Sequence, residues 1–213
     1  MRWRLVPLAA LMGVLAMAPL AGAGAPTDQL RSAVDRAIKT LDDPEFKKPA
    51  RAEERRAQVR AAAQEIFNFK ELARRTLARH WRERTPEEQE EFAALFAELL
   101  ERAYLGKIEL YRGEKVRYTD EKVEEDYATI STMIVTKEGP EVPVEYRMLR
   151  NGTRWEVYDV VVEGVSLVAN YRSQFNRIIQ TSGYAELVKR LRAKQVEIQP
   201  PGEGKAKPKS KGQ

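Results

Sequence analysis

The chain has 213 residues, is 43% hydrophobic and 32% charged, and carries a formal net charge of +5 at pH 7. It contains no cysteine and one histidine, which excludes disulfides, thiol catalysis and thiolate metal sites and argues against a histidine-based zinc site. The two arginines of the first four residues and a surplus of three positive charges in residues 199–213 account for the whole net charge. The remaining body is neutral, which argues against a nucleic-acid partner.

The first 23 residues have the pattern of a cleaved secretory signal. A basic start, Met1–Arg4, precedes the uncharged apolar run Leu5–Leu20, and Ala21–Ala23 supplies an A-x-A cleavage site. The apolar run is shorter than the roughly 20 residues that a membrane-spanning helix needs, which favours cleavage over anchoring. We therefore expect residues 1–23 to be a removed signal peptide and residues 24–198 to be one folded domain. Residues 199–213 are basic and rich in proline and glycine, which is typical of a disordered tail.

Helical spacing dominates the first half of the domain. Residues 27–41 carry one apolar stripe, residues 50–64 a second, and Asn68 followed by Glu71 resembles a cap for a short third helix. Thr85-Pro86-Glu87-Glu88 is a capping box with proline at the first helical position. The helix that it opens keeps apolar residues at steps of three and four as far as Gly113.

From Glu114 the apolar period changes to two, which predicts strands. The four expected strands are residues 115–123, 127–136, 142–150 and 154–162. The Asn151-Gly152 pair is a strong hairpin signal, so we expect an antiparallel meander. The fourth strand is apolar on both sides, which indicates that both of its faces are covered.

Two helices complete the domain. Ser166 is a suitable N-cap for a helix that ends at Gly183, and residues 184–194 have the spacing of a last helix. The sequence thus predicts an α+β fold, a curved antiparallel sheet of about four strands packed against several helices.

Few residues are placed for catalysis. His80 lies between arginines and is expected to be a surface or packing residue. Asp159 and Glu163 end an apolar strand near a glycine turn, where a carboxylate could act as the general base of a small isomerase or dehydratase. Alternatively, both carboxylates bond backbone or arginine in the turn, and we favour this second interpretation. No phosphate-binding loop or nucleophile elbow is present, so we expect no catalytic residues, no metal site and no enzyme activity.

The segment Trp155–Phe175, with its W-x-V-Y-D-V and E-G-V-S runs, resembles the signature of the MlaC-like family of periplasmic phospholipid-binding proteins. Trp81, the Thr85 capping box and the apolar residues from Phe92 to Tyr104 are similar to the family's central helix, and Val144–Tyr146 to its third strand. The resemblance covers nearly all of residues 27–191.

The resemblance implies an NTF2-like cone of sheet and helices around an apolar cavity, and a soluble, monomeric periplasmic carrier without cofactor. Such an auxiliary component of an ABC transport system shuttles phospholipid between an outer-membrane lipid-handling complex and an inner-membrane ABC transporter, and so supports the lipid asymmetry of the outer membrane. A structural adaptor of the transporter that binds no lipid is the other possibility. The apolar spacing by itself fits a filled core as well as a hollow one. By position in the family, the lipid-binding wall comprises Tyr104, Ile108, Tyr146, Met148, Trp155, Val157, Val160, Val165, Leu167, Val168 and Phe175.

Overall fold

The computed structural model describes residues 25–136 and 139–196. The expected signal peptide at residues 1–23 and the expected tail at residues 199–213 lie outside the described residues. Within them, no helix is long and apolar enough to cross a bilayer.

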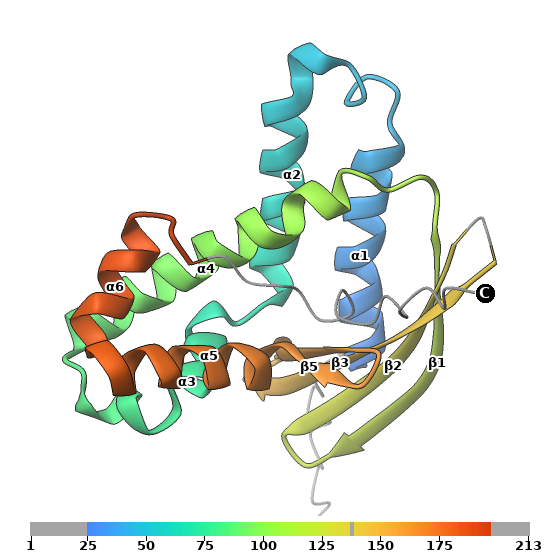
Figure 1. The fold of residues 1–213 in the computed structure, drawn as a ribbon. Coiled ribbons are helices and arrows are strands. Elements are labelled where there is room, and N and C mark those ends of the chain that lie inside the picture. Colours follow the sequence, from blue (N-terminus) through green and yellow to red (C-terminus); the bar gives the residue numbers. More distant parts are fainter. Residues whose placement is uncertain (1–24, 137–138, 197–213) are drawn as a thin grey trace, which may run out of the picture.

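The described part of the chain begins with an antiparallel pair of helices that rises above the rest of the molecule (Figure 1). The pair consists of α1 (Pro26–Asp42) and α2 (Ala52–Ile66), joined through the short 3-10 helix η1 (Pro49–Arg51). Next come α3 (Phe69–Leu77), the 3-10 helix η2 (Ala78–Glu83) and the long α4 (Pro86–Ile108), whose C-terminal end returns toward α2.

The caps predicted for two of these helices are confirmed. The Asn68 side chain accepts a hydrogen bond from the Glu71 backbone N–H at 2.8 Å. Thr85 and Glu88 bond reciprocally, backbone N–H to side chain, at 3.0 and 3.3 Å. The expectation that α4 continues to Gly113 is wrong, because the helix ends at Ile108 and the chain turns toward the sheet. Tyr111, which kept the helical spacing, instead donates a hydrogen bond to Asp42 of α1 at 3.2 Å.

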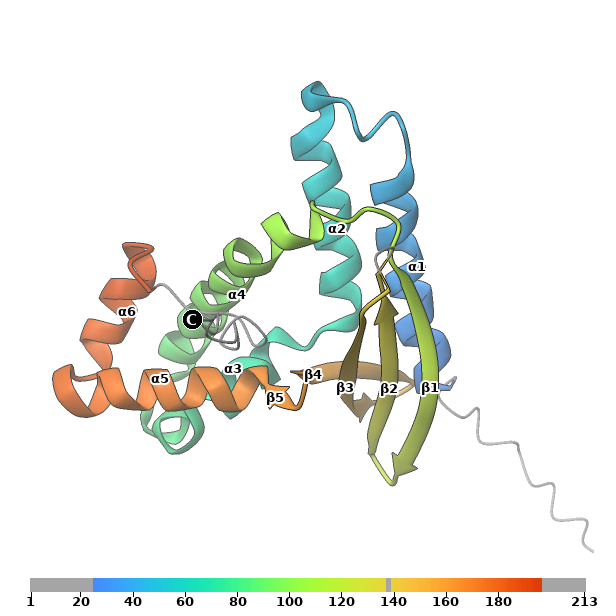
Figure 2. The same cartoon turned by 45° about the vertical axis from the view of Figure 1, so that its right-hand side comes forward.

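The sheet is an antiparallel meander in the order β1-β2-β3-β4-β5, curved and open (Figure 2). Its strands are β1 (Lys115–Glu124), β2 (Tyr127–Val135), β3 (Glu141–Asn151), β4 (Arg154–Val162) and the two-residue β5 (Val165–Ser166), which the sequence did not predict. Helices α5 (Leu167–Ser182) and α6 (Tyr184–Arg192) follow, with Gly183 between them at a φ of 83°. Ser166 caps α5 as expected, since its Oγ accepts a hydrogen bond from the Ala169 N–H at 3.0 Å. The predicted α+β fold is confirmed.

A bulge decides which β4 side chains share a face. Arg147 of β3 lies opposite Asp159, whereas Met148, the next residue, lies opposite Val157. Because neighbouring β3 residues point to opposite faces, Val157 and Asp159 do so too, and strict alternation is broken at Tyr158. Without the bulge, Val160 would point away from the face that holds Val157.

The buried apolar residues form two clusters rather than one. The sheet cluster joins α1 and the end of α2 to one face of the sheet, and contains Leu30, Ala33, Ile66, Ala128, Ile130, Met148, Trp155 and Val157. The helical cluster unites α3, η2, α4, α5 and α6, and its largest members include Trp81, Phe92, Phe96, Tyr171, Phe175 and Leu187. Phe67, between α2 and α3, packs against both clusters.

Phe96 is the centre of the helical cluster, and its loss should be costly. Its ring meets Tyr171 edge-on at 5.1 Å and Phe175 at 5.7 Å between centroids, and it has no exposed surface. We expect Phe96→Ala to lower the free energy of unfolding by about 3–5 kcal/mol, measured by urea denaturation. Leu110→Ala is the control, because Leu110 is 67% exposed. A shift of less than 1 kcal/mol for Phe96→Ala would contradict this assignment of the core.

Candidate functional site

Five of the predicted wall residues share one face of the sheet. Trp155, Val157 and Val160 of β4 lie opposite Arg150, Met148 and Tyr146 of β3, all on the face that carries the sheet cluster. The bulge in β4 is what places Val160 there. The five that the structure brings together are Tyr146, Met148, Trp155, Val157 and Val160.

The remaining six predicted wall residues lie elsewhere. Leu167, Val168 and Phe175 are buried in the helical cluster, and Tyr104 is half-buried against it. Phe175 sits among the rings of Phe92, Phe96 and Tyr171, so its side chain is part of a filled core. Ile108 and Val165 belong to neither cluster and are 39% and 44% exposed.

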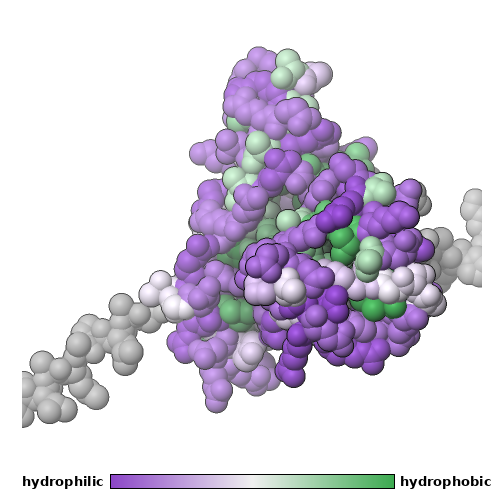
Figure 3. Space-filling model, turned by 90° about the vertical axis from the view of Figure 1, so that its left-hand side faces the viewer, coloured by the Kyte–Doolittle hydropathy of each residue, from purple (hydrophilic) through white to green (hydrophobic). Residues whose placement is uncertain are grey.

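Half-buried residues at the margins of the two clusters are the best candidates for contact with a ligand. We call five of them the seam: Phe67, which packs against both clusters, Tyr104 at the margin of the helical cluster, and Tyr118, Tyr146 and Val160 at the margin of the sheet cluster. Burial raises the pKa of the Tyr146 hydroxyl to about 12, yet the side chain keeps accessible surface. Space-filling shows apolar side chains lying in hollows between polar ones on one face of the molecule (Figure 3).

The seam includes two residues that sequence reasoning missed. Tyr118 belongs to β1, whose alternation of Val116 and Tyr118 with charged residues was a usable signal. Phe67 lies in a link between two helices, where no periodicity applies. The Phe67 link is pinned to the sheet, because the Asn68 N–H donates to the Val157 carbonyl at 2.9 Å.

Two hollows flank α1 and are lined mostly by polar and charged residues. They have volumes of about 240 and 430 Å³, and Ser32 and Arg36 line both. Neither contains a residue of the predicted wall or of the seam.

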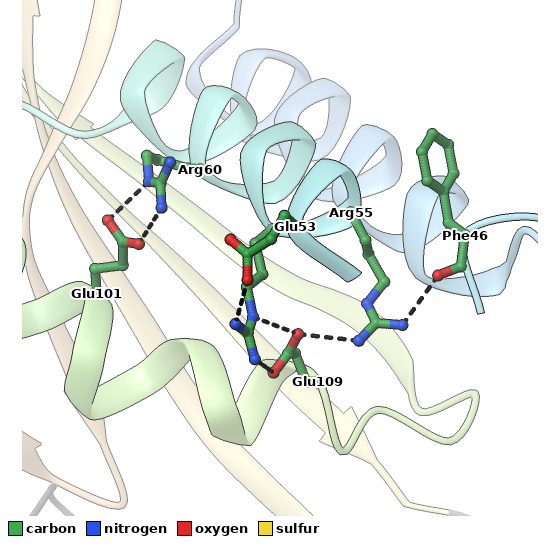
Figure 4. Close-up of polar contacts among 7 residues, drawn as sticks. Phe46, Glu53, Arg55, Arg60, Glu101 and Glu109 are labelled. Carbon is green, nitrogen blue, oxygen red and sulfur yellow. Dashed lines mark hydrogen bonds and ion pairs between the residues drawn. The ribbon is translucent and has the colours of Figure 1, made fainter. Parts of the chain in front are cut away.

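Ion pairs join α2 to the C-terminal half of α4 and to Glu109, the residue that follows it (Figure 4). Glu109 accepts hydrogen bonds from Arg55 and Arg56 at 3.0 Å each, and Glu101 pairs with Arg60. We call these five residues the clasp. Arg55 also donates to the Phe46 carbonyl at 3.0 Å. The clasp holds the end of α4 that carries Tyr104 and Ile108 beside α2.

Asp159 is a structural residue of the joint between β4 and α5. Its side chain is buried, and its Oδ2 accepts from the Ser166 hydroxyl at 2.6 Å and from Arg147 at 3.3 Å. Its Oδ1 accepts from the Val168 N–H at 3.0 Å. A general base needs a free lone pair directed at substrate, and these contacts occupy Asp159 instead. The interpretation that Asp159 bonds backbone and arginine is confirmed.

Glu163 and His80 also have structural surroundings. Glu163 has a φ of 49° in the turn before Gly164, is exposed, and donates its N–H to the Pro143 carbonyl at 3.0 Å. His80 lies within η2, with Nε2 at 3.1 Å from the Asn176 side-chain oxygen. In residues 25–136 and 139–196, no three His, Cys, Asp or Glu side chains gather where they could hold a metal ion.

Three comparisons relate the chain to known proteins. A family model described as MlaC protein matches residues 31–193. The intermembrane phospholipid transport system binding protein MlaC of Haemophilus influenzae is 24% identical over 129 residues, which cover 58% of this chain and 60% of that relative. A phospholipid-binding protein from Ralstonia solanacearum, solved in complex with a phospholipid, has the same fold with a TM-score of 0.71. It is 24% identical, and the match covers 79% of this chain and 96% of that one.

Removing the Asp159 carboxylate should loosen the joint between sheet and α5. We expect Asp159→Ala to lower the free energy of unfolding by about 2–3 kcal/mol, because it leaves the buried Val168 N–H without its acceptor. Ser166→Ala, which removes the cap but keeps the carboxylate, should cost about 1 kcal/mol. Thermal and urea unfolding measure both. Equal losses for the two variants would show that the carboxylate adds nothing beyond the cap.

The clasp should make stability depend on pH through Glu109. Hydrogen bonding by Arg56 lowers the pKa of Glu109 from its ordinary value of 4.5 in the folded protein. The folded state therefore takes up this proton less readily than the unfolded state, so the stabilisation is present above pH 4.5 and is lost as pH falls. Glu109→Gln should therefore be less stable than wild type at neutral pH, with the difference shrinking below pH 4.5 in urea titrations.

The matched control for the clasp is Glu54→Gln. Glu54 is also paired, with Arg51, but both residues belong to the same stretch of chain and the pair is exposed. We expect its substitution to leave the cooperative unfolding midpoint nearly unchanged. If both variants behave alike, joining α2 to α4 confers no special stability.

Proposed function

Because the chain belongs to the MlaC family, we propose that it is a periplasmic phospholipid carrier that buries acyl chains at the seam between its two apolar clusters. The wall would consist of the predicted residues nearest the seam, above all Tyr146, Val160 and Tyr104. The observation that supports this most is the set of half-buried apolar side chains at the margins of both clusters. The phospholipid in the Ralstonia structure of the same fold agrees with it.

Elementary energetics explain what such a carrier does. Burial of one methylene is worth about 0.8 kcal/mol, so a lipid with two long acyl chains leaves a bilayer for water only at a cost of roughly 20 kcal/mol. Apolar side chains that cover the acyl chains offset this cost without any bond being made or broken. We expect affinity to come mainly from the chains, and no turnover of the lipid.

We further propose that the carrier exchanges lipid between an outer-membrane lipid-handling complex and an inner-membrane ABC transporter, in agreement with the intermembrane transport system named for the Haemophilus relative. The expected signal peptide would place the protein in the periplasm. The carrier would then be a monomer with one lipid site, and it would cross the aqueous space together with its cargo.

Lipid retention tests the carrier proposal directly. Protein purified without detergent from a phospholipid-rich host should yield near-stoichiometric phospholipid in an organic extract analysed by mass spectrometry. Val160→Asp should lose most of that lipid, because it places a charge on the seam. Val123→Asp in β1 is the control, since Val123 is 48% exposed. Circular dichroism and thermal unfolding of each variant separate loss of lipid from loss of fold.

Absence of lipid from the folded wild-type protein would contradict the carrier proposal and favour an adaptor role. Equal lipid content in Val160→Asp and wild type would contradict the location at the seam.

A further inference from the structure

Two tyrosines of the seam, Tyr118 and Tyr146, lie on the face of the sheet that carries the sheet cluster. Tyr118 of β1 is opposite Thr132 of β2, and Tyr146 of β3 is opposite Ile130, two residues earlier on the same strand. Residues two apart on a strand share a face, so both tyrosines point to the same side. Both also pack against the sheet cluster.

The two hydroxyls differ in burial within the described part of the chain. The Tyr118 hydroxyl oxygen is buried and has no hydrogen-bond partner there. The Tyr146 hydroxyl is not among the buried ones without a partner, and its side chain keeps accessible surface. A buried hydroxyl without a partner costs about 1–3 kcal/mol, so Tyr118 calls for an acceptor that the described part of the protein does not supply.

The surroundings keep both groups protonated and therefore able to donate. Burial is the main cause that raises the pKa of each hydroxyl, and for Tyr118 the neighbouring Tyr146 and Asp35 add to it. Arg31 of α1 works in the opposite direction, but its guanidinium lies over the Tyr118 ring, 4.7 Å from the centroid. At neutral pH both tyrosines are thus protonated and able to donate a hydrogen bond.

The acceptor that fits this environment is neutral. Asp35 and Arg31 act on the Tyr118 hydroxyl in opposite directions, so their charges do not select an anion such as phosphate, whereas a carboxylic ester offers a carbonyl oxygen without charge. In a diacyl glycerophospholipid the two ester carbonyls stand where the acyl chains begin, at the boundary between apolar and polar parts. We propose that Tyr118 and Tyr146 donate hydrogen bonds to the ester carbonyl oxygens of the cargo. This inference rests on the proposed carrier function and assigns the polar contacts of the same site.

Comparison of ester and ether lipids tests the assignment. Dioctanoyl phosphatidylethanolamine and its dioctyl ether analogue share headgroup and chain length, but only the first has carbonyl oxygens. Affinity of delipidated protein for each, by titration calorimetry, should fall about fivefold for the ester lipid in Tyr118→Phe and in Tyr146→Phe. Affinity for the ether lipid should stay unchanged.

Tyr127→Phe is the matched control, because Tyr127 lies on the opposite face of the same sheet against Tyr158. It should alter neither affinity. The lipid-free stability of Tyr118→Phe should equal or exceed that of wild type, since the substitution removes a hydroxyl without a partner.

Each other outcome is decisive. Equal losses for ester and ether lipid would move the acceptor to the headgroup and overturn the ester assignment. No loss for either lipid would remove both tyrosines from the site while leaving the carrier function in place. A wild-type protein that binds neither lipid would contradict the carrier function itself, and this inference with it.

Discussion

The buried carboxylate of Asp159 is the contact on which the arrangement of the molecule depends. It lies near the end of β4, the last long strand of the sheet, where the chain passes into the helical cluster. It accepts hydrogen bonds from the side chains of Arg147 in β3 and Ser166 in β5, and from the Val168 N–H in the first turn of α5. Three hydrogen bonds to one carboxylate fix the direction in which α5 leaves the sheet. Since Tyr171 and Phe175 of α5 are central to the helical cluster, this direction determines where that cluster sits. A residue with the appearance of a catalytic base is therefore an architectural one.

Two apolar clusters in a domain of this size have a functional consequence. A single core would bury its largest side chains completely, whereas here several large residues stop halfway, at the margins. Helix α1 covers the sheet cluster, and the helical cluster is packed between helices alone. Phe67 contacts both clusters. The clasp then ties α4 to α2 by charge rather than by apolar packing. Such a construction leaves several large apolar side chains half-buried at the margins of the clusters.

Much of this could be predicted from the sequence, for reasons that differ between elements. The caps at Asn68, Thr85 and Ser166 are local, so a few neighbouring residues determine them. Strand boundaries followed from alternation and turn residues to within about one position. The end of α4 was misjudged because Tyr111 keeps the helical period while its hydroxyl serves α1.

The site was harder to predict. The spacing of apolar residues indicates which side chains point into the protein, but it does not indicate which other element they contact. Phe175 and Val168 lie on a stripe of α5 that faces the other helices, and the sheet holds a different set. The β4 bulge, which groups Val160 with Val157, leaves no mark in the composition of the strand. Tyr118 became a candidate because its buried hydroxyl has no hydrogen-bond partner among the described residues, and only the three-dimensional packing shows this.

The helical cluster is assembled from two stretches of chain with the entire sheet between them. Phe92 and Phe96 come from before the sheet, and Tyr171 and Phe175 from after it. Contacts between such distant residues form late, because closing a long loop costs entropy that only the finished core repays. During synthesis the first stretch thus has no complete core to join until the last helices emerge. A chain truncated before α5 would therefore lack the residues of α5 and α6, and the apolar side chains of α3, η2 and α4 would have no partners to complete the helical cluster.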